Sequence, residues 1–163
     1  GASIIKRPKY ISGDKSSTES AIKHYIKSIK NKPNIIILLQ ATSPLRPKKS
    51  LDYAINYFVK EDFDSMLSIS PTHRFFWRIK DKRIAFPEYD YLNRPRRQDL
   101  NKKQIRFIET GSLYIFSYNN FLKTGNRLGG SIGYLEWPEE YSYEIDTIED
   151  FRFVENLFIK LNK

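Results

Sequence analysis

The chain lacks cysteine altogether, so neither disulfide bonds nor thiolate chemistry can contribute to its structure or activity. It has no apolar run long enough to cross a membrane, and residues 1–8 contain no long apolar segment of the secretory type. No glycine-rich phosphate loop precedes the first expected helix. These absences favour a cytoplasmic protein that does not bind membranes.

Basic and aromatic residues are what the chain has in abundance. Lysine and arginine number 28 against 19 acidic residues, a formal net charge of +9, and 15% of the 163 residues are aromatic. Such a charge favours anionic partners such as nucleotides or acidic sugars. The positive charge is spread along the chain, with one tight cluster at 94–97, so we expect no nucleic-acid partner.

Hydrophobic periodicity predicts alternating strands and helices in the first half. The five apolar residues at 35–39 form a run that is typical of a strand buried on both faces of a parallel sheet. Ser16 and Glu19 have capping-box spacing, and the apolar spacing that follows predicts a helix over 17–30. Similar patterns predict the end of a strand at 4–7, a helix around 51–58 and a strand at 65–69.

In the second half, residues 71–108 are aromatic and basic with little periodicity, and we interpret them as an insertion with possible strands at 75–79 and 105–108. Strands at 112–116 and 133–137 continue the sheet. Thr147 and Asp150 again have capping-box spacing, ahead of a C-terminal helix with its expected apolar face at Phe151, Val154, Leu157, Phe158 and Leu161. This order predicts a single α/β domain over 1–163, with a parallel sheet, helices on its faces and right-handed crossovers.

The turn after the strand at 35–39 is the most informative segment. It contains Gln40, Thr42, Ser43 and Arg46, and ligands of open α/β sheets bind beyond the carboxyl ends of the strands. An amide, two hydroxyls and a guanidinium suit a ligand with hydroxyls and negative charge. The alternative is an ordinary strand-to-helix loop with a helix cap.

Five segments, in order, resemble motifs of the acylneuraminate cytidylyltransferases, the CMP-sialic acid synthetases and their legionaminic and pseudaminic acid relatives. The resemblance covers nearly the whole chain. The segments are 7–18 (RPKYISGDKSST), 38–46 (LLQATSPLR), 96–100 (RRQDL), 109–115 (ETGSLYI) and 144–150 (EIDTIED).

The resemblance implies transfer of CMP from CTP to the anomeric hydroxyl of a nine-carbon acidic sugar, with release of pyrophosphate and a requirement for Mg²⁺. It implies a three-layer α/β/α nucleotidyltransferase (Rossmann-like) fold with a mostly parallel sheet. Members of the family are usually homodimers, so the insertion at 71–108 is expected to be a dimerisation arm.

The same resemblance assigns site residues. Arg7, Ser16 and Thr18 fall where the family contacts CTP, and Glu144 with Asp146 falls on its metal pair. Asp146 and Arg97 are the expected catalytic residues. The expected sugar-binding residues are Gln40, Arg96, Gln98 and Phe107.

Each of these assignments has a structural alternative. Arg7 could be an ordinary residue at a strand end, and Ser16 a helix cap. Gln40 could cap a buried strand, the arginines at 96–97 could be solvated surface, and the two acids could be a lead-in that offsets the dipole of the last helix.

The chain departs from the family pattern in several places. The family's opening segment (PARxGSKG), which wraps the triphosphate, is absent. We therefore expect residues 1–163 to bind CTP poorly and to be a fragment or a truncation without the first β-α unit. A non-catalytic binding or assembly module is the alternative.

Substitutions within the motifs bear on the substrate. Glu144 replaces an aspartate, Ala41 a proline and Thr110 an asparagine. Ile108 and Trp77 stand at or near positions where some sialic acid enzymes have an arginine and a lysine, so the sugar need not be N-acetylneuraminate. Another acidic sugar, such as an octulosonic acid, is a lesser alternative because those enzymes have a different central motif.

Overall fold

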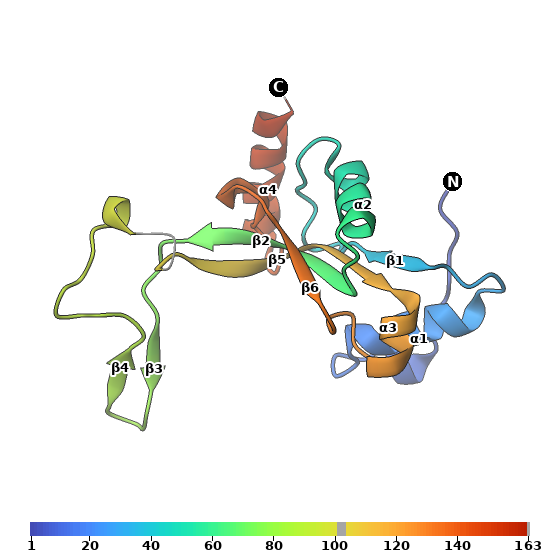
Figure 1. The fold of residues 1–163 in the computed structure, drawn as a ribbon, viewed down its shortest axis with the longest axis horizontal. Helices are drawn as coiled ribbons and strands as arrows, with labels where there is room; N and C mark the ends of the chain where they lie inside the picture. Colours follow the sequence, from blue (N-terminus) through green and yellow to red (C-terminus); the bar gives the residue numbers. More distant parts are fainter. Residues whose placement is uncertain (101–103, 163) are drawn as a thin grey trace.

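A four-stranded sheet forms the centre of the computed structural model, which describes residues 1–100 and 104–162 (Figure 1). The strands are ordered β1 (Ile35–Leu38), β5 (Arg106–Ser117), β2 (Ser65–Thr72) and β6 (Ile132–Glu136). β5 is antiparallel to both of its neighbours, whereas β2 and β6 are parallel. Three of the four strands therefore point the same way, as the sequence predicted.

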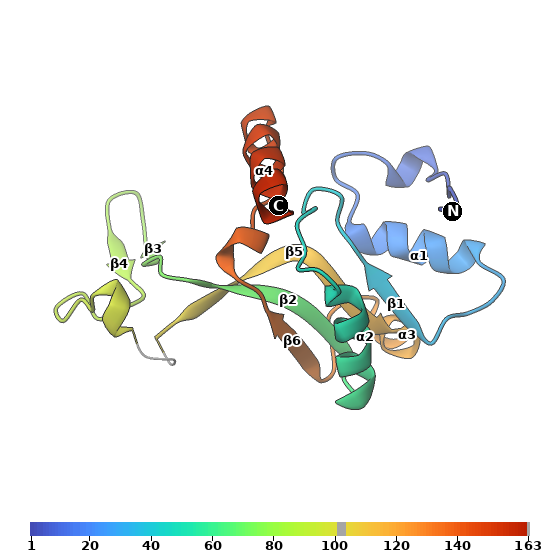
Figure 2. The ribbon, with the colours of Figure 1, turned by 90° about the horizontal axis from the view of Figure 1, so that it is seen from above.

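Helices cover both faces of this sheet. α1 (Thr18–Ser28) and α3 (Tyr118–Thr124) lie on one side, and α2 (Ser50–Lys60) and α4 (Ile148–Leu161) on the other (Figures 1 and 2). The expected three-layer α/β/α arrangement is confirmed. The described residues contain no helix that is long and apolar enough to cross a membrane.

Two apolar cores lie on the two faces, and β5 contributes to both because successive side chains of a strand point to opposite faces. The core beneath α1 and α3 contains Ile22, Ile26, Ile36, Tyr114, Phe116, Tyr118 and Phe121. The core beneath α2 contains Ala54, Phe58, Met66, Leu113, Ile115, Leu135 and Trp137. β5 is thus the strand that ties the two layers of helices together.

The N-terminal residues differ from the prediction. Residues 4–7 do not form a strand, and Ile4 is 96% exposed. A strand requires a partner for its backbone N–H and C=O groups, and within the described ranges none pairs with this segment. The expected strand end at 4–7 is therefore wrong.

The cap of the first helix is also one residue away from the prediction. Ser17, not Ser16, caps α1, because its Oγ accepts the Ser20 N–H at 3.2 Å. Glu19 makes an ion pair with Arg127 instead of completing a capping box with Ser16. The sequence also missed α3, although Ser117 caps it and Gly125, with φ of 71°, ends it.

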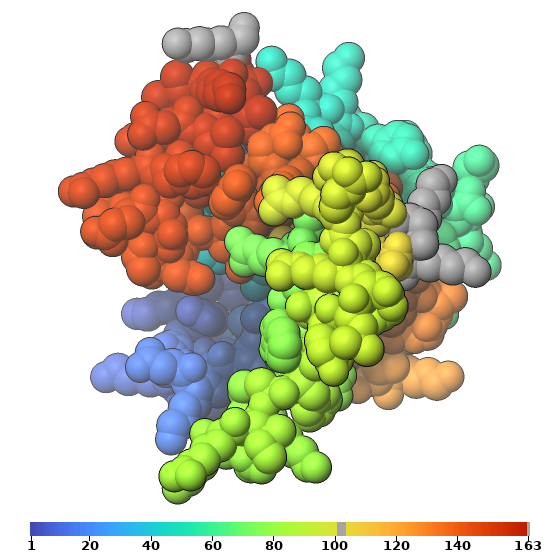
Figure 3. All heavy atoms as spheres, turned by 90° about the vertical axis from the view of Figure 1, so that its left-hand side faces the viewer, coloured from blue at the N-terminus to red at the C-terminus, as the bar shows by residue number. Residues whose placement is uncertain are grey.

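The described parts of the expected insertion, 71–100 and 104–108, form an arm that extends away from the layers of helices (Figure 1). β2 and the first residues of β5 lead into it, and a hairpin of β3 (Trp77–Ile79) and β4 (Ala85–Pro87) projects from it. The space-filling view from the arm's side shows this hairpin protruding below the rest of the molecule (Figure 3). Its apolar side chains are exposed, including Trp77 at 52% and Ile79 at 74%.

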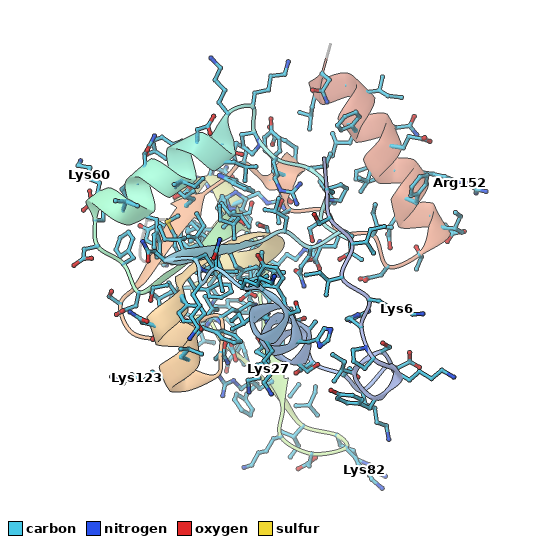
Figure 4. The ribbon with its side chains drawn as sticks, turned by 90° about the vertical axis from the view of Figure 1, so that its right-hand side faces the viewer. Lys6, Lys27, Lys60, Lys82, Lys123 and Arg152 are labelled. Carbon is cyan, nitrogen blue, oxygen red and sulfur yellow. The ribbon has the colours of Figure 1, made fainter. Side chains whose placement is uncertain are left out.

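The positive charge is distributed over all the layers. Lys27, Lys60, Lys123 and Arg152, labelled in Figure 4, lie on α1, α2, α3 and α4 respectively, and all four are exposed. The absence of a nucleic-acid partner stays a prediction, and this distribution agrees with it.

α4 begins with the capping box that the sequence predicted. Thr147 Oγ1 accepts the Asp150 N–H at 3.1 Å, and Asp150 Oδ2 accepts the Thr147 N–H at 2.9 Å. Of the expected apolar face, Val154 is buried, whereas Phe151 and Phe158 are about half exposed. The capping box therefore contributes substantially to fixing where α4 begins.

Thr147→Ala should lower the melting temperature by roughly 2–4 °C, because an N-cap oxygen is lost. Thr147→Ser is the matched control, since it keeps that oxygen.

Hydrogen bonds from the Thr147 side chain and backbone hold the pKa of Asp150 below its ordinary value of 3.8. That stabilisation is present above pH 3.8 and is lost as the pH falls through the lowered pKa. The difference between wild type and Thr147→Ala should therefore shrink in acid, and a difference that grows would contradict this account.

Candidate active site

A bulge in β5 at Gly111 lies at the centre of the candidate site. The pairing of β2 with β5 shifts register between Leu67 and Ile69, and Gly111 has φ of 64°, in the left-handed region. A Cβ atom at this position would collide with carboxylate oxygen Oε1 of Glu144 and amide oxygen Oε1 of Gln40, and would lie 2.7 Å from Ser43 Oγ. Only glycine allows the strand to pass so closely beneath these three side chains.

Buried hydroxyls replace the ladder hydrogen bonds that the bulge removes. Ser68 Oγ and Thr110 Oγ1 lie 2.6 Å apart, in hydrogen-bond contact. Ser68 Oγ also accepts the Leu113 N–H at 3.1 Å, and Thr110 Oγ1 accepts the Ser112 N–H at 3.4 Å. All of these side chains except that of Leu113 are polar and fully buried, and each has its hydrogen bonds satisfied locally.

Arg46 holds the loop after β1 in place. Its Nε donates to the Ser112 carbonyl at 3.0 Å, Nη2 to the Ser43 carbonyl at 3.1 Å and Nη1 to the Pro44 carbonyl at 3.3 Å. Burial lowers the pKa of this guanidinium from its ordinary value. The sequence suggested Arg46 as a group for a charged ligand, but its donors are directed at backbone carbonyls, so the structure gives it a structural role.

The segment before α4 is fastened to the same loop. Ser43 Oγ donates to Glu144 Oε1 at 3.1 Å, and the Ile145 N–H donates to the Thr42 carbonyl at 2.8 Å. These two bonds bring Glu144 beside Gln40, beyond the carboxyl end of β1 where the sequence placed a ligand. The sequence suggested the Ser43 hydroxyl as a group for a ligand; the fold shows that it donates to Glu144 and orients that carboxylate.

The donor set at this point suits a hard cation and a hydroxylated ligand. The oxygens of Gln40 and Glu144 converge above Gly111, so a hydroxyl or a cation can be shared between them. The Asp146 side chain is exposed and accepts no hydrogen bond from the described residues, since only its backbone N–H is engaged, by Asp150. Carboxylates are the protein ligands that Mg²⁺ prefers, and phosphates and water complete its shell.

Two of the three predicted nucleotide-binding residues lie at the start of α1. Thr18 is its first residue, and Ser16 precedes the cap. Both side chains are partly buried, and neither hydroxyl makes a side-chain hydrogen bond within the described ranges. Arg7 is exposed in the irregular N-terminal segment. The structure leaves these groups available for a ligand.

The predicted site residues on the arm do not lie near Gln40 and Glu144 of the same chain. Arg97 and Gln98 belong to the short helix η2 (Arg97–Asp99), which lies in the arm, far from β1 and the start of α4 (Figure 1). Arg96 makes a two-pronged ion pair with Asp99, with Nε 2.6 Å from Oδ2. Phe107, near the start of β5, is 43% exposed.

Known proteins with similar sequences are named N-acylneuraminate cytidylyltransferase. The chain is 32% identical to an N-acylneuraminate cytidylyltransferase A of Danio rerio, over 98% of this chain and 37% of the relative. It is 30% identical to the N-acylneuraminate cytidylyltransferase of Oncorhynchus mykiss, over 98% of this chain and 37% of the relative. It is 25% identical to that of Streptococcus agalactiae, over 93% of this chain and 36% of the relative. The chain thus spans little more than a third of these relatives, and no family model matches it.

Among solved structures, the fold is similar to 4-diphosphocytidyl-2C-methyl-D-erythritol synthase of Anaerococcus prevotii, with a TM-score of 0.56 and 12% identity over 89% of this chain and 67% of that one. This likeness concerns the fold alone. Together with the relatives, it confirms the resemblance to the acylneuraminate cytidylyltransferases and the nucleotidyltransferase fold that the resemblance implied.

Gly111→Ala should lower the free energy of unfolding by about 1–2 kcal/mol, because an alanine in the left-handed region clashes with its own carbonyl. The added methyl should also displace Gln40 and Glu144. Urea unfolding measures the first effect. Gly13→Ala is the control, since the space around that glycine is open. Equal unfolding midpoints for the two variants would contradict the role assigned to the bulge.

Proposed function

We propose that this chain is part of an enzyme that transfers CMP from CTP to the anomeric hydroxyl of a nine-carbon acidic sugar and releases pyrophosphate. The observation that carries the proposal is the convergence of Gln40, Ser43 and Glu144 over Gly111, beyond the carboxyl end of β1. With Gly111 they come from three separate motifs of the resemblance, at 38–46, 109–115 and 144–150, and the fold unites them at one point.

On the sugar side, the Gln40 amide provides both a donor and an acceptor, which suits a glycerol tail or an N-acyl group. On the metal side, Glu144 and Asp146 would hold Mg²⁺. When bound, that ion would neutralise charge on the phosphates of CTP. Ser43 keeps the Glu144 carboxylate in place through its hydrogen bond of 3.1 Å. Catalysis would then depend mainly on positioning and electrostatic stabilisation.

On the nucleotide side, the free hydroxyls of Ser16 and Thr18 would hydrogen-bond CTP, and Arg7 would approach its phosphate or ribose oxygens. Ser16 and Thr18 lie at the N-terminal end of α1, where unpaired backbone N–H groups favour anions.

A homodimer would give the arm its role. Arg96, Arg97, Gln98 and Phe107 lie on the arm, away from the site of their own chain, so a second copy is what would bring them to a sugar. The exposed Trp77 and Ile79 of the hairpin are apolar surface that a partner would cover. A guanidinium from the arm could then bind the sugar carboxylate with two hydrogen bonds.

The full-length gene product should release pyrophosphate when given CTP, Mg²⁺ and a member of a panel of nonulosonic acids. Reactions with ATP or UTP, and reactions without sugar, are the controls. Residues 1–163 alone should turn over slowly, because the family's triphosphate-wrapping segment is absent from them. No release with any acid from a folded full-length protein would reject the assignment, and sugar binding without turnover would favour a non-catalytic module.

Asp146→Asn in the full-length protein should reduce the rate on the order of 10²-fold and raise the Mg²⁺ concentration needed for half-maximal activity. Glu144→Gln should have a smaller effect if its longer side chain acts through a water molecule. Glu155→Gln, an exposed change on α4, is the control. Melting temperatures must accompany the rates, because Asp146 adjoins the capping residue Thr147. A normal rate with unchanged magnesium dependence would remove Asp146 from the metal site.

A further inference from the structure

Arg127, in the turn between α3 and β6, links elements that are distant in the sequence. Its Nη1 donates to the Glu19 carboxylate in the first turn of α1. Its Nη2 lies 3.8 Å from Glu109 Oε1 on β5, and its guanidinium carbon lies 4.5 Å from the centre of the Tyr114 ring. The Tyr114 hydroxyl in turn donates to Glu109. One guanidinium thus connects the start of α1 to β5.

This connection is largely removed from water. The side chains of Arg127 and Glu19 are 19% and 20% exposed, and Arg127 Nε is buried without a partner in the described part of the chain. A guanidinium in a poorly hydrated place interacts more strongly with carboxylates than it would on an open surface. Its planar fork also fixes direction, which a lysine ammonium does not.

The pKa values of Arg127 and Tyr114 are both raised in this cluster. Burial opposes the charged form of Arg127, but its hydrogen bond to Tyr114 and the nearby Glu19 carboxylate outweigh burial and raise its pKa. Burial and the hydrogen bond to Glu109 raise the pKa of Tyr114 to about 12. Tyr114 therefore remains a donor and Arg127 remains a cation, so the link is permanent.

The start of α1 has few other attachments. Ile22 and Ile26 are its buried residues, and both lie beyond its first turn. The segment before it forms no strand, and its cap is internal to the helix. Within the described structure, the pair with Arg127 is the ion pair that Glu19 makes, and it ties the first turn of α1 to the segment between α3 and β6.

We propose that Arg127 is a positioning residue for the nucleotide. It fixes the first turn of α1, which contains Thr18, relative to β5, which contains Gly111 two residues beyond Glu109. The inference rests on the proposed function, because it takes Ser16 and Thr18 as contacts of CTP. Neither Arg127 nor Glu19 is assigned a contact with substrate.

The test uses the full-length protein with Arg127→Lys and Glu19→Gln, each of which retains most of the side-chain volume. Both should raise the KM for CTP on the order of tenfold while leaving kcat and the KM for the sugar within about twofold of wild type. The double variant should be no worse than either single one, because both remove the same link. Arg152→Lys and Glu155→Gln, on the exposed face of α4, are the matched controls and should change nothing.

A second readout does not depend on catalysis. Hydrogen exchange at the amides of residues 20–24 should be faster in Arg127→Lys and Glu19→Gln than in wild type, with the amides of β5 unchanged. An unchanged KM for CTP in both variants, whatever their melting temperature, would overturn the inference. A wild-type protein that neither binds nor consumes CTP would instead overturn the proposed function, and unchanged exchange in the variants would then reject the tie itself.

Discussion

The close passage of β5 beneath Gln40, Ser43 and Glu144 is the constraint on which the arrangement of the site depends. It requires a left-handed residue without a side chain, and Gly111 meets that requirement. The bulge would leave backbone groups unpaired in a buried place, and the hydroxyls of Ser68 and Thr110 satisfy them. The buried hydroxyls of Ser68 and Thr110 therefore support the bulge over which the loop after β1 and the segment before α4 meet.

β5 also decides how the layers relate to one another. Alternate side chains of this strand enter the core under α1 and α3 and the core under α2, so neither layer of helices is independent of the site. The same strand contains Glu109, which approaches Arg127, and Tyr114, which Arg127 covers. Changes in the packing of either layer would reach the bulge through a single strand, without the need for a chain of loop movements.

Local patterns were sufficient for part of this structure. The apolar run at 35–39 predicted the strand β1, and Thr147 with Asp150 predicted the start of α4, because the determining residues are adjacent in the sequence. The expected burial of this strand on both faces is wrong: β1 lies at the edge of the sheet, antiparallel to β5, and Ile37 is 37% exposed. The motifs that place Gln40 and Glu144 at the site are likewise contiguous. The tie between Glu19 and Arg127 could not be predicted, since the two residues are 108 positions apart and no local pattern relates them.

Two errors have the same physical origin. Whether Ser16 or Ser17 caps α1 depends on which oxygen reaches a free N–H, and sequence spacing allowed either. Whether residues 4–7 form a strand depends on a partner strand, and the pairing that defines a sheet is a property of the fold. The order of strands in the sheet is likewise a property of the fold: β5 lies between β1 and β2, although it comes later in the chain. This order also dictates when the sheet can assemble. β1 and β2 pair with β5 and not with each other, so until residues 106–117 have been synthesised the β3–β4 hairpin is the only strand pairing open to the described residues. Folding of the central sheet must therefore wait for the second half of the chain and close long loops, which makes it slow and exposes apolar strands in the meantime.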